Sequence, residues 1–396
     1  MTSSWLPRSV CVCEPVCRGF EHAMVNAAIL HTALFAFPEA SLTFAAEEEH
    51  GNRVRANLFA IDAAQAARVC WETISIAPRL SSNRQRLPFE FRTLRQIFDI
   101  GRQQRADLLF FSSATELGLF ALKMLLVRGR PSFRILAMLH NVLTSFETVR
   151  TKPFSRFRGL PAVFALPQPV GLRYIALGES IFNHLHAIHP KAARYFDVLD
   201  LPHEWAASAP ASDSPGGSIV FGFLGVSQGK GFQTFAEVVE RVRAVEPSAR
   251  FSLVGHLNSP GDCAKYSRIT EDAECKPLPD DEYRRRGLAL TYTVWTADPR
   301  HYGLVASATF LDTLSLVKPT IYLHNPYIDT YASRMGDIGY ACSSVQDMQE
   351  QIISLIRAFP AERYREQCAT IVRTRDVFSP RVLGERLRAI VLNWKE

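Results

Sequence analysis

Short runs of apolar and β-branched residues alternate along the chain with longer segments whose apolar positions recur at helical spacing. This alternation predicts βαβ units and therefore parallel sheets. Between the strands of the first half lie helical patterns such as Glu21–Phe35 and Thr115–Leu126. The expected strands there are Ser9–Cys13, Leu42–Ala45, Asp107–Ser112, Arg134–Leu139, Tyr174–Leu177 and Val198–Leu201.

A run of small residues rich in Pro, Gly and Ser at 206–217 interrupts this pattern and is the clearest linker in the sequence. The alternation then restarts and closes with two or three C-terminal helices. The expected elements are strand Ile219–Leu224, helix Phe232–Val242, strands Phe251–Val254 and Leu288–Val294, a helix opening at Ser307, and strand Thr320–Leu323. The pattern predicts two Rossmann-like α/β halves with ligands bound in the cleft between them, at the carboxyl ends of the strands.

The length of 396 residues favours two domains, and the composition (47% hydrophobic, 21% charged) is that of a globular protein. The longest apolar stretch, Leu108–Val127, contains Glu116 and Lys123, so we expect no membrane-spanning helix. Glu14 and Pro15 interrupt the apolar N-terminus and argue against a signal peptide. We therefore expect a cytoplasmic protein.

Metal binding is not expected from the cysteines and histidines. The spacing of Cys11, Cys13 and Cys17 lacks a nearby fourth ligand, and these residues suit a buried strand and its loop. His184 and His186 fall on different faces of one expected helix.

Positive charge is concentrated in the first half of the chain. Residues 1–205 carry 23 Lys and Arg against 17 Asp and Glu, which accounts for the whole net charge of +6. Clusters lie at Arg79–Arg105 and at Arg150, Lys152, Arg156 and Arg158. Such a face suits an anionic membrane surface or an acidic acceptor, and a solvated arginine-rich surface explains it equally well. No nucleic-acid-binding motif accompanies the charge.

The segment Tyr302–Leu323 predicts a loop, a helix and a buried strand. Ser307 and Thr309 stand where hydroxyl side chains satisfy the free N–H groups of a first helical turn. The same helix N-terminus favours an anion such as a diphosphate. Helix capping alone also accounts for both residues.

Several segments, taken in order along the chain, resemble glycosyltransferases of the GT-B fold, in a divergent form similar to family 4. The segment Phe223–Phe232 resembles the first strand and glycine-rich loop of the donor domain, with Gly225 and Lys230 at the donor diphosphate. Phe251–His256 is similar to the next strand. The donor-binding residues that the resemblance implies are Gly225, Lys230, His256, Tyr283, Ser307, Thr309 and Asp312.

In the first half, Leu139–Asn141 resembles the strand end beside the acceptor, and Ile175–Ser180 resembles a strand-to-helix turn. The implied acceptor-binding residues are His140, Asn141 and Glu179. The sequence departs from the family at Val226, where many retaining members have an arginine, and at Leu304, where they have the first of two glutamates.

Glycosyl transfer needs a base for the acceptor hydroxyl and stabilisation of the departing diphosphate. Glu21 and His22 follow the first strand, where catalytic loops of such folds lie. Histidine side chains titrate near neutrality, so His22 is a candidate base. His22 and Glu21 are therefore the expected catalytic residues, and satisfied cleft-edge side chains are the alternative.

The resemblance implies four segments: an acceptor-binding domain at 1–205, a linker at 206–217, a nucleotide-sugar-binding domain at 218–378, and a helix at 379–396 that crosses back to the first domain. It implies a metal-independent, hexosyltransferase-type enzyme without a cofactor. The enzyme would move a sugar from a nucleotide-diphosphate sugar to a hydroxyl of a saccharide or lipid-linked saccharide, in polysaccharide or glycoconjugate biosynthesis, with peripheral membrane contact through the basic half. A non-catalytic GT-B partner subunit and a sugar-nucleotide epimerase of the same fold remain alternatives.

Overall fold

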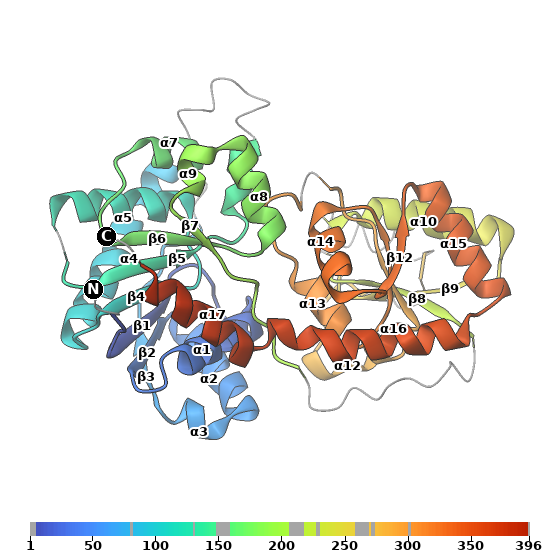
Figure 1. Ribbon diagram of the computed structural model, residues 1–396, viewed down its shortest axis with the longest axis horizontal. Coiled ribbons are helices and arrows are strands. Elements are labelled where there is room, and N and C mark those ends of the chain that lie inside the picture. The colour runs from blue at the N-terminus through green and yellow to red at the C-terminus, as the bar shows by residue number, and fades with distance from the viewer. Residues whose placement is uncertain are drawn as a thin grey trace. The chain divides into compact units, whose positions relative to one another are not determined.

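The computed structural model describes residues 5–79, 82–129, 131–147, 159–205, 218–226, 230–257, 269–270, 274–299 and 302–394. The expected linker at 206–217, the basic residues Arg150, Lys152, Arg156 and Arg158, and Gly229 of the donor loop lie outside these residues. The chain divides into two compact units (Figure 1). The N-terminal unit comprises Met1–Glu204, Leu304–Ala306 and Val377–Glu396, and the C-terminal unit comprises Trp205–Gly303 and Ser307–Asp376.

The N-terminal unit contains a seven-stranded parallel sheet with the order β3-β2-β1-β4-β5-β6-β7. The central strand β1 is buried at every position, as expected for a parallel strand covered on both faces. Between β1 and β4 the strand order reverses, which makes their carboxyl ends a topological switch point. The strands are β1 Ser9–Glu14, β2 Ser41–Ala46, β3 Val69–Thr73, β4 Leu108–Phe111, β5 Arg134–Met138, β6 Leu172–Ala176 and β7 Phe196–Val198.

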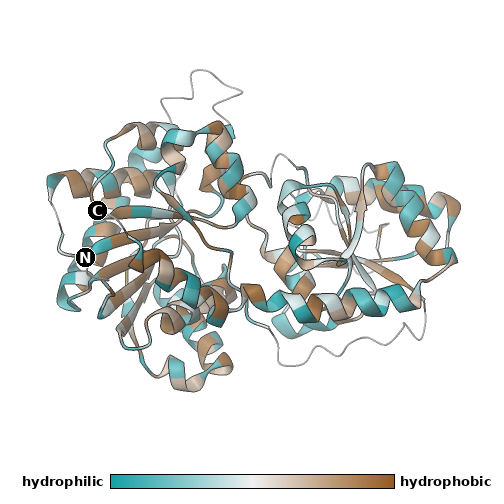
Figure 2. Ribbon diagram, viewed as in Figure 1, coloured by the Kyte–Doolittle hydropathy of each residue, from teal (hydrophilic) through white to brown (hydrophobic). Residues whose placement is uncertain are grey.

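Helices pack in groups around this sheet: α1 lies against α2 and α17, α4 against α5, and α5 against α7. Figure 2 shows brown, apolar strands inside each unit and more polar helix surfaces outside. The helices are α1 Ala23–Ala36, α2 Glu48–Ile61, α3 Ala63–Ala66, α4 Asn83–Gln103, α5 Glu116–Arg128, η1 Val142–Thr144, α7 Gly159–Ala165, α8 Glu179–Ile188, α9 Pro190–Ala193 and α17 Pro380–Leu392.

The C-terminal helix α17 belongs to the N-terminal unit and packs on α1 (Figure 1). It starts with an N-cap hydrogen bond from Val382 N–H to the Ser379 side chain and has proline in its first turn. Gly384 allows the close approach, since a Cβ there would lie 2.6 Å from Cβ of Phe35.

The C-terminal unit contains a five-stranded parallel sheet with the order β12-β11-β10-β8-β9. Its switch point lies between β8 and β10. The elements are β8 Val220–Leu224, α10 Phe232–Val245, β9 Arg250–Val254, α12 Asp280–Leu288, β10 Tyr292–Trp295, α13 Ala308–Ser315, β11 Thr320–Leu323, α14 Pro326–Met335, β12 Gly339–Cys342, α15 Val345–Arg357 and α16 Ala361–Thr374. The short helix η4 Arg375–Phe378 contains the chain boundary between the two units.

The predicted parallel α/β architecture is confirmed, and the differences are shifted element boundaries and two strands that the pattern did not predict. The expected strand at Val198–Leu201 is displaced, because the pairing with β6 uses Phe196–Val198. Leu288 ends helix α12 and does not begin strand β10. Strands β3 and β12 were not anticipated; both are short and lie at sheet edges, where only one side is paired. Within the described residues, none of the helices combines the length and apolar character that a bilayer crossing requires.

Candidate functional site

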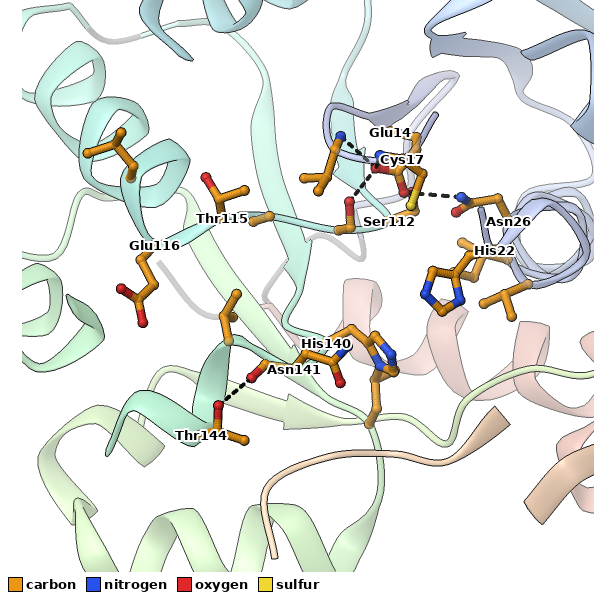
Figure 3. A pocket seen from close by; sticks show the side chains of 18 of the residues that line it. Glu14, Cys17, His22, Asn26, Ser112, Thr115, Glu116, His140, Asn141 and Thr144 are labelled. Carbon is orange, nitrogen blue, oxygen red and sulfur yellow. Dashed lines mark hydrogen bonds between the residues drawn. The ribbon is translucent and has the colours of Figure 1, made fainter. Parts of the chain in front are cut away.

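The carboxyl ends of β1, β4 and β5 enclose a pocket of about 440 Å³ in the N-terminal unit (Figure 3). It lies at the switch point of the sheet, where ligands of such folds bind. Figure 3 shows His22 and His140 on one side of the pocket and Thr115 and Glu116 on the other. Apolar lining comes from Val16, Val25, Ile29, Leu117, Val142, Leu177 and Leu201.

A buried carboxylate, Glu14, lies at the end of β1 and lines this pocket. Its Oε1 accepts hydrogen bonds from the backbone N–H groups of Val16 (2.8 Å) and Cys17 (3.0 Å). Its Oε2 accepts from Asn26 Nδ2 (3.1 Å) and Ser112 Oγ (2.9 Å), and the Ser113 hydroxyl also donates to Oε1. Neutral donors thus surround a carboxyl group that is 1% exposed, and they tie the loops after β1 and β4 to helix α1.

The same network extends to helix α2 through His50. Asn26 Nδ2 lies 2.9 Å from His50 Nε2, and His50 Nδ1 lies 2.9 Å from the carbonyl oxygen of Gly19. Because the Asn26 amide donates and the carbonyl accepts, Nε2 of His50 is the acceptor and Nδ1 carries the proton. His50 is fully buried, so this chain of hydrogen bonds fixes the loop that leads to His22.

His22 and His140 face one another across the pocket edge, with ring centroids 5.5 Å apart in a T-shaped arrangement. Burial, with a smaller effect of His22, lowers the pKa of His140 to about 4, so its ring is neutral near pH 7. Nδ1 of His140 is buried and has no hydrogen-bond partner among the described residues.

Two residues that line the pocket have positive φ angles. His22 has φ 51° and Asn141 has φ 61°, a region that non-glycine residues seldom occupy. The helix expected from Glu21 begins at Ala23, and His22 is its N-cap residue. Such strain persists where surrounding contacts hold it, and it gathers at functional sites.

Glu21 and Glu179 lie elsewhere. Glu21 forms an ion pair with Arg79 and accepts a hydrogen bond from Arg18 N–H (3.2 Å); it does not line the pocket. These partners lower the pKa of the Glu21 carboxyl. Glu179 is an exposed first residue of α8, and it too is absent from the pocket lining.

The C-terminal unit brings the expected donor residues together at the end of β8. A Cβ added to Gly225 would lie 2.6 Å from Nζ of Lys230 and 2.6 Å from Cγ2 of Thr309. Gly225 has φ 62°, so both its backbone conformation and its surroundings require glycine. The lysine amine and the start of helix α13 therefore meet over one glycine.

Asp312 and Tyr283 complete this group. The Tyr283 hydroxyl donates to Oδ2 of Asp312 at 3.2 Å. Burial raises the pKa of Asp312 to about 6, against the opposing effect of the positive charge of Lys230. Burial also lowers the pKa of Lys230, while Asp312 raises it. The lysine and the aspartate act on each other's ionisation within one desolvated group.

Ser307 caps helix α13, since its Oγ accepts from Phe310 N–H at 3.2 Å. The same Oγ lies 3.0 Å from Oγ1 of Thr309. His256 follows Gly255, whose Cα position lies against the end of β8, because a Cβ there would be 3.0 Å from Val226 N. The structure thus places six of the seven expected donor residues at or next to the carboxyl edge of this sheet. The seventh, Tyr283 on α12, reaches this group through its hydrogen bond to Asp312.

Sequence reasoning missed Glu14, Asn26 and His50 as site residues. Glu14 ends a strand of buried residues, and a charged residue at such a point was a usable signal. Asn26 and His50 lie in helices and gave no local signal. In the described part of the chain, no group of three or more His, Cys, Asp and Glu side chains is arranged to hold a metal ion.

No family model matches the sequence, and no curated protein matches it. Among solved structures, WaaG, a glycosyltransferase involved in lipopolysaccharide biosynthesis, is similar with a TM-score of 0.63 at 12% identity, over 97% of this chain and 100% of that one. HepE of Anabaena, in complex with UDP and glucose, has a TM-score of 0.63 at 12% identity, with 98% and 100% covered. OtsA has a TM-score of 0.67 at 10% identity, again with 98% and 100% covered.

The two α/β units with parallel sheets therefore define a Rossmann-like architecture of two parts. Its similarity to these structures over their whole length shows that the chain has the GT-B fold. The expected fold is confirmed, and identities of 10–12% carry no further information about activity.

Proposed function

We propose that this protein is a glycosyltransferase that uses a nucleoside-diphosphate sugar and a hydroxyl acceptor. The observation that carries the proposal is the meeting of Lys230, Thr309 and Gly225 at the end of β8. A lysine amine, a helix N-terminus and a glycine turn are features that bind a diphosphate. The UDP in the HepE structure is consistent with such a donor.

In this proposal Lys230 and the N-terminus of α13 stabilise the charge that develops on the departing diphosphate. Asp312 holds hydroxyl groups of the donor, oriented by Tyr283. The acceptor lies in the pocket of the N-terminal unit, with its hydroxyl near His22 and His140. His22 takes the acceptor proton, and the neutral ring of His140 lies beside it. We do not assign a catalytic role to Glu21, because its carboxylate is paired with Arg79.

The finer parts of the proposal concern the acceptor and the place of the reaction. The apolar lining of the pocket suits a saccharide attached to an apolar group, such as a lipid-linked saccharide in polysaccharide or glycoconjugate biosynthesis. The reaction is of hexosyl-transfer type, needs no metal, and takes place in the cytoplasm at a membrane surface.

Calorimetric titration with UDP, GDP and their sugar forms tests the donor site. We expect one nucleotide to bind, and Lys230→Ala to weaken it by at least about tenfold, which corresponds to roughly 1.4 kcal/mol. Lys276→Ala, which removes an exposed lysine of the same unit, is the matched control and leaves binding unchanged. Folded protein that binds none of these nucleotides contradicts the proposal.

A non-catalytic partner subunit is a second candidate, favoured by Val226 and Leu304 at positions where many retaining GT-B enzymes have arginine and glutamate. Such a subunit binds no donor, or binds it without consuming it. Following the sugar nucleotide by chromatography, with and without candidate acceptors, separates the possibilities. Transfer or slow hydrolysis supports the enzyme, and conversion of the donor alone to its epimer identifies an epimerase.

A further inference from the structure

Strand β3 forms one edge of the seven-stranded sheet, and no described strand pairs with its outer side (Figure 1). On its inner side, Ile74 N–H donates to the carbonyl oxygen of Ala46 at the end of β2. Hydrogen bonds to the two sides alternate along a strand, so the backbone groups of Val69 and Trp71 point outward. In the part of the chain that the structure describes, these outward N–H and C=O groups have no hydrogen-bond partner. They offer a second strand a row of donors and acceptors.

Few of the features that keep edge strands from pairing are present in β3. Its five residues, Val69–Thr73, include no proline and no lysine, and their register with β2 is continuous. At the carboxyl end, Gln96 of α4 donates to the carbonyl oxygen of Thr73 at 3.1 Å and accepts from Ser75 N–H at 2.9 Å. The open part of the edge is therefore centred on Cys70, which is exposed.

The charged side chains on the two sides of Cys70 are opposite in sign. Arg68, directly before the strand, is exposed and donates to two neutral oxygens. Glu72, two residues after Cys70, accepts from the neutral amide of Gln104 at 3.1 Å. Neither Arg68 nor Glu72 forms an ion pair with a described residue. An antiparallel copy of the same segment supplies each of them with the charge that it lacks.

Helix α2 adds an apolar surface beside this edge. Phe59 is 38% exposed, and the guanidinium of Arg55 lies 5.7 Å from the centre of its ring. The same guanidinium lies 5.8 Å from the ring of Trp71, which packs against Phe44 with ring centroids 5.6 Å apart. These contacts hold the half-buried Trp71 at the edge, where a further strand would cover it.

We propose that two copies of this chain pair through β3, antiparallel, about a two-fold axis at Cys70. A two-fold axis makes two identical edges antiparallel, so Arg68 of each copy lies beside Glu72 of the other. Val69 lies opposite Trp71, and the outward groups of each such pair exchange both of their backbone hydrogen bonds. The lining of the candidate acceptor pocket includes no residue of β3, and the pairing is independent of the proposed function.

Oxidation of the full chain with diamide tests the register. Among the described free cysteines, Cys70 is exposed and the five others are buried. In the proposed pairing the two Cys70 residues occupy a non-hydrogen-bonded position with Cα atoms about 4.5 Å apart, which a disulfide spans. We expect a disulfide-linked dimer on a non-reducing gel, and Cys70→Ser abolishes it.

The matched control is the double variant Cys70→Ser, Thr73→Cys, which moves the thiol to another exposed position of the same strand. In the proposed register the two copies of position 73 are about 20 Å apart, so this variant gives no linked dimer. Equal cross-linking of the wild type and this variant shows random collision and overturns the proposal.

Charge reversal tests the pairing without oxidation. In sedimentation equilibrium of the reduced chain we expect a dimer with a Kd on the order of 10 µM, because a short edge buries little surface. Arg68→Glu alone, or Glu72→Arg alone, places like charges beside each other twice and weakens the dimer about tenfold. The double variant Arg68→Glu, Glu72→Arg restores opposite charges and the affinity of the wild type. Arg128→Glu, at an exposed position of α5, is the control and leaves the Kd unchanged.

The double variant also separates pairing from folding, because a side chain that only stabilises its own copy is not rescued by reversal of its partner in the other copy. A reduced chain that stays monomeric up to about 200 µM overturns the proposal and leaves the edge to a strand of another protein. A double variant as weak as the single variants overturns it as well.

Discussion

Replacing Glu14 with glutamine tests whether the buried network shapes the pocket. The substitution preserves size but exchanges one acceptor oxygen for an NH₂ group. If the remaining oxygen faces the N–H groups of Val16 and Cys17, the new NH₂ meets the NH₂ of Asn26. Two donors then oppose each other inside the protein, and one of them loses its partner.

Turning the Asn26 amide over does not solve the conflict. Its oxygen would then face Nε2 of His50, which carries no proton while Nδ1 donates to Gly19. Any arrangement with neutral His50 leaves one buried polar group unpaired, at a cost of about 1–3 kcal/mol. The hydrogen bonds to Val16 and Cys17 also lose the strengthening that an ionised acceptor provides.

Hydrogen exchange measured by mass spectrometry provides the assay, since it reports local opening. A cost of about 1–3 kcal/mol corresponds to roughly 5- to 150-fold faster exchange in a peptide that covers residues 15–26. Glu48→Gln, at an exposed position of α2, is the control and leaves this peptide unchanged. Unaltered exchange in Glu14→Gln refutes the reasoning, and uniform acceleration across the unit shows that the effect is not local to the loop.

Three further predictions concern individual groups. Because burial lowers the pKa of His140 to about 4, its neutral ring favours the folded state above pH 6.5 and this contribution is lost as the pH falls toward 4; an NMR titration midpoint near 6.5 contradicts it. Burial raises the pKa of Asp312 to about 6. The free energy of unfolding of the wild type, relative to that of Asp312→Asn, therefore falls by no more than about 3 kcal/mol as the pH rises from 4 to 6. Urea titrations in which this difference in unfolding free energy stays constant over the same pH range contradict the prediction. Gly231→Ala places a Cβ 2.0 Å from the carbonyl oxygen of Thr296. It lowers the melting temperature more than Gly171→Ala, a control with a similar φ and open space around the glycine. Equal decreases in melting temperature show that the contact with Thr296 adds nothing to the backbone strain.

The sequence was sufficient for the architecture because strands of a parallel sheet are continuously apolar. β1 and β4 are buried at every position, so their apolar runs are visible without any knowledge of their neighbours. Edge strands such as β3 carry exposed and half-buried residues, and this mixed pattern concealed them. The shift of the last strand, from Val198–Leu201 to Phe196–Val198, reflects pairing with β6, which no local pattern records.

The candidate sites were predictable only where one residue carries its own signal. Gly225, Lys230 and Ser307 stand in a glycine-rich loop or at a helix start, and the structure places them at the carboxyl edge of one sheet. Glu21 carried the same type of signal but forms an ion pair with Arg79. Local sequence could not predict this pair, because Arg79 comes from a segment distant in sequence. A residue's partners, which decide between catalysis and structure, are set by tertiary packing.

Both units place their candidate residues by the same physical means. At a switch point, the loops that follow two neighbouring strands lead to opposite faces of the sheet. Their backbone N–H groups therefore lack partners within a sheet or a helix. The N-terminal unit satisfies that deficit with the carboxylate of Glu14, which accepts from the N–H groups of Val16 and Cys17. The C-terminal unit instead gathers the amine of Lys230, itself a donor, with Thr309 around Gly225. A resident anion fills the first position, so the first pocket needs no anionic ligand and accepts a hydroxyl group. Lys230 and a helix N-terminus favour an anion at the second, with Asp312 as the acidic neighbour of the lysine. This difference in charge, and not the shared fold, is the physical reason for assigning acceptor and donor to different units.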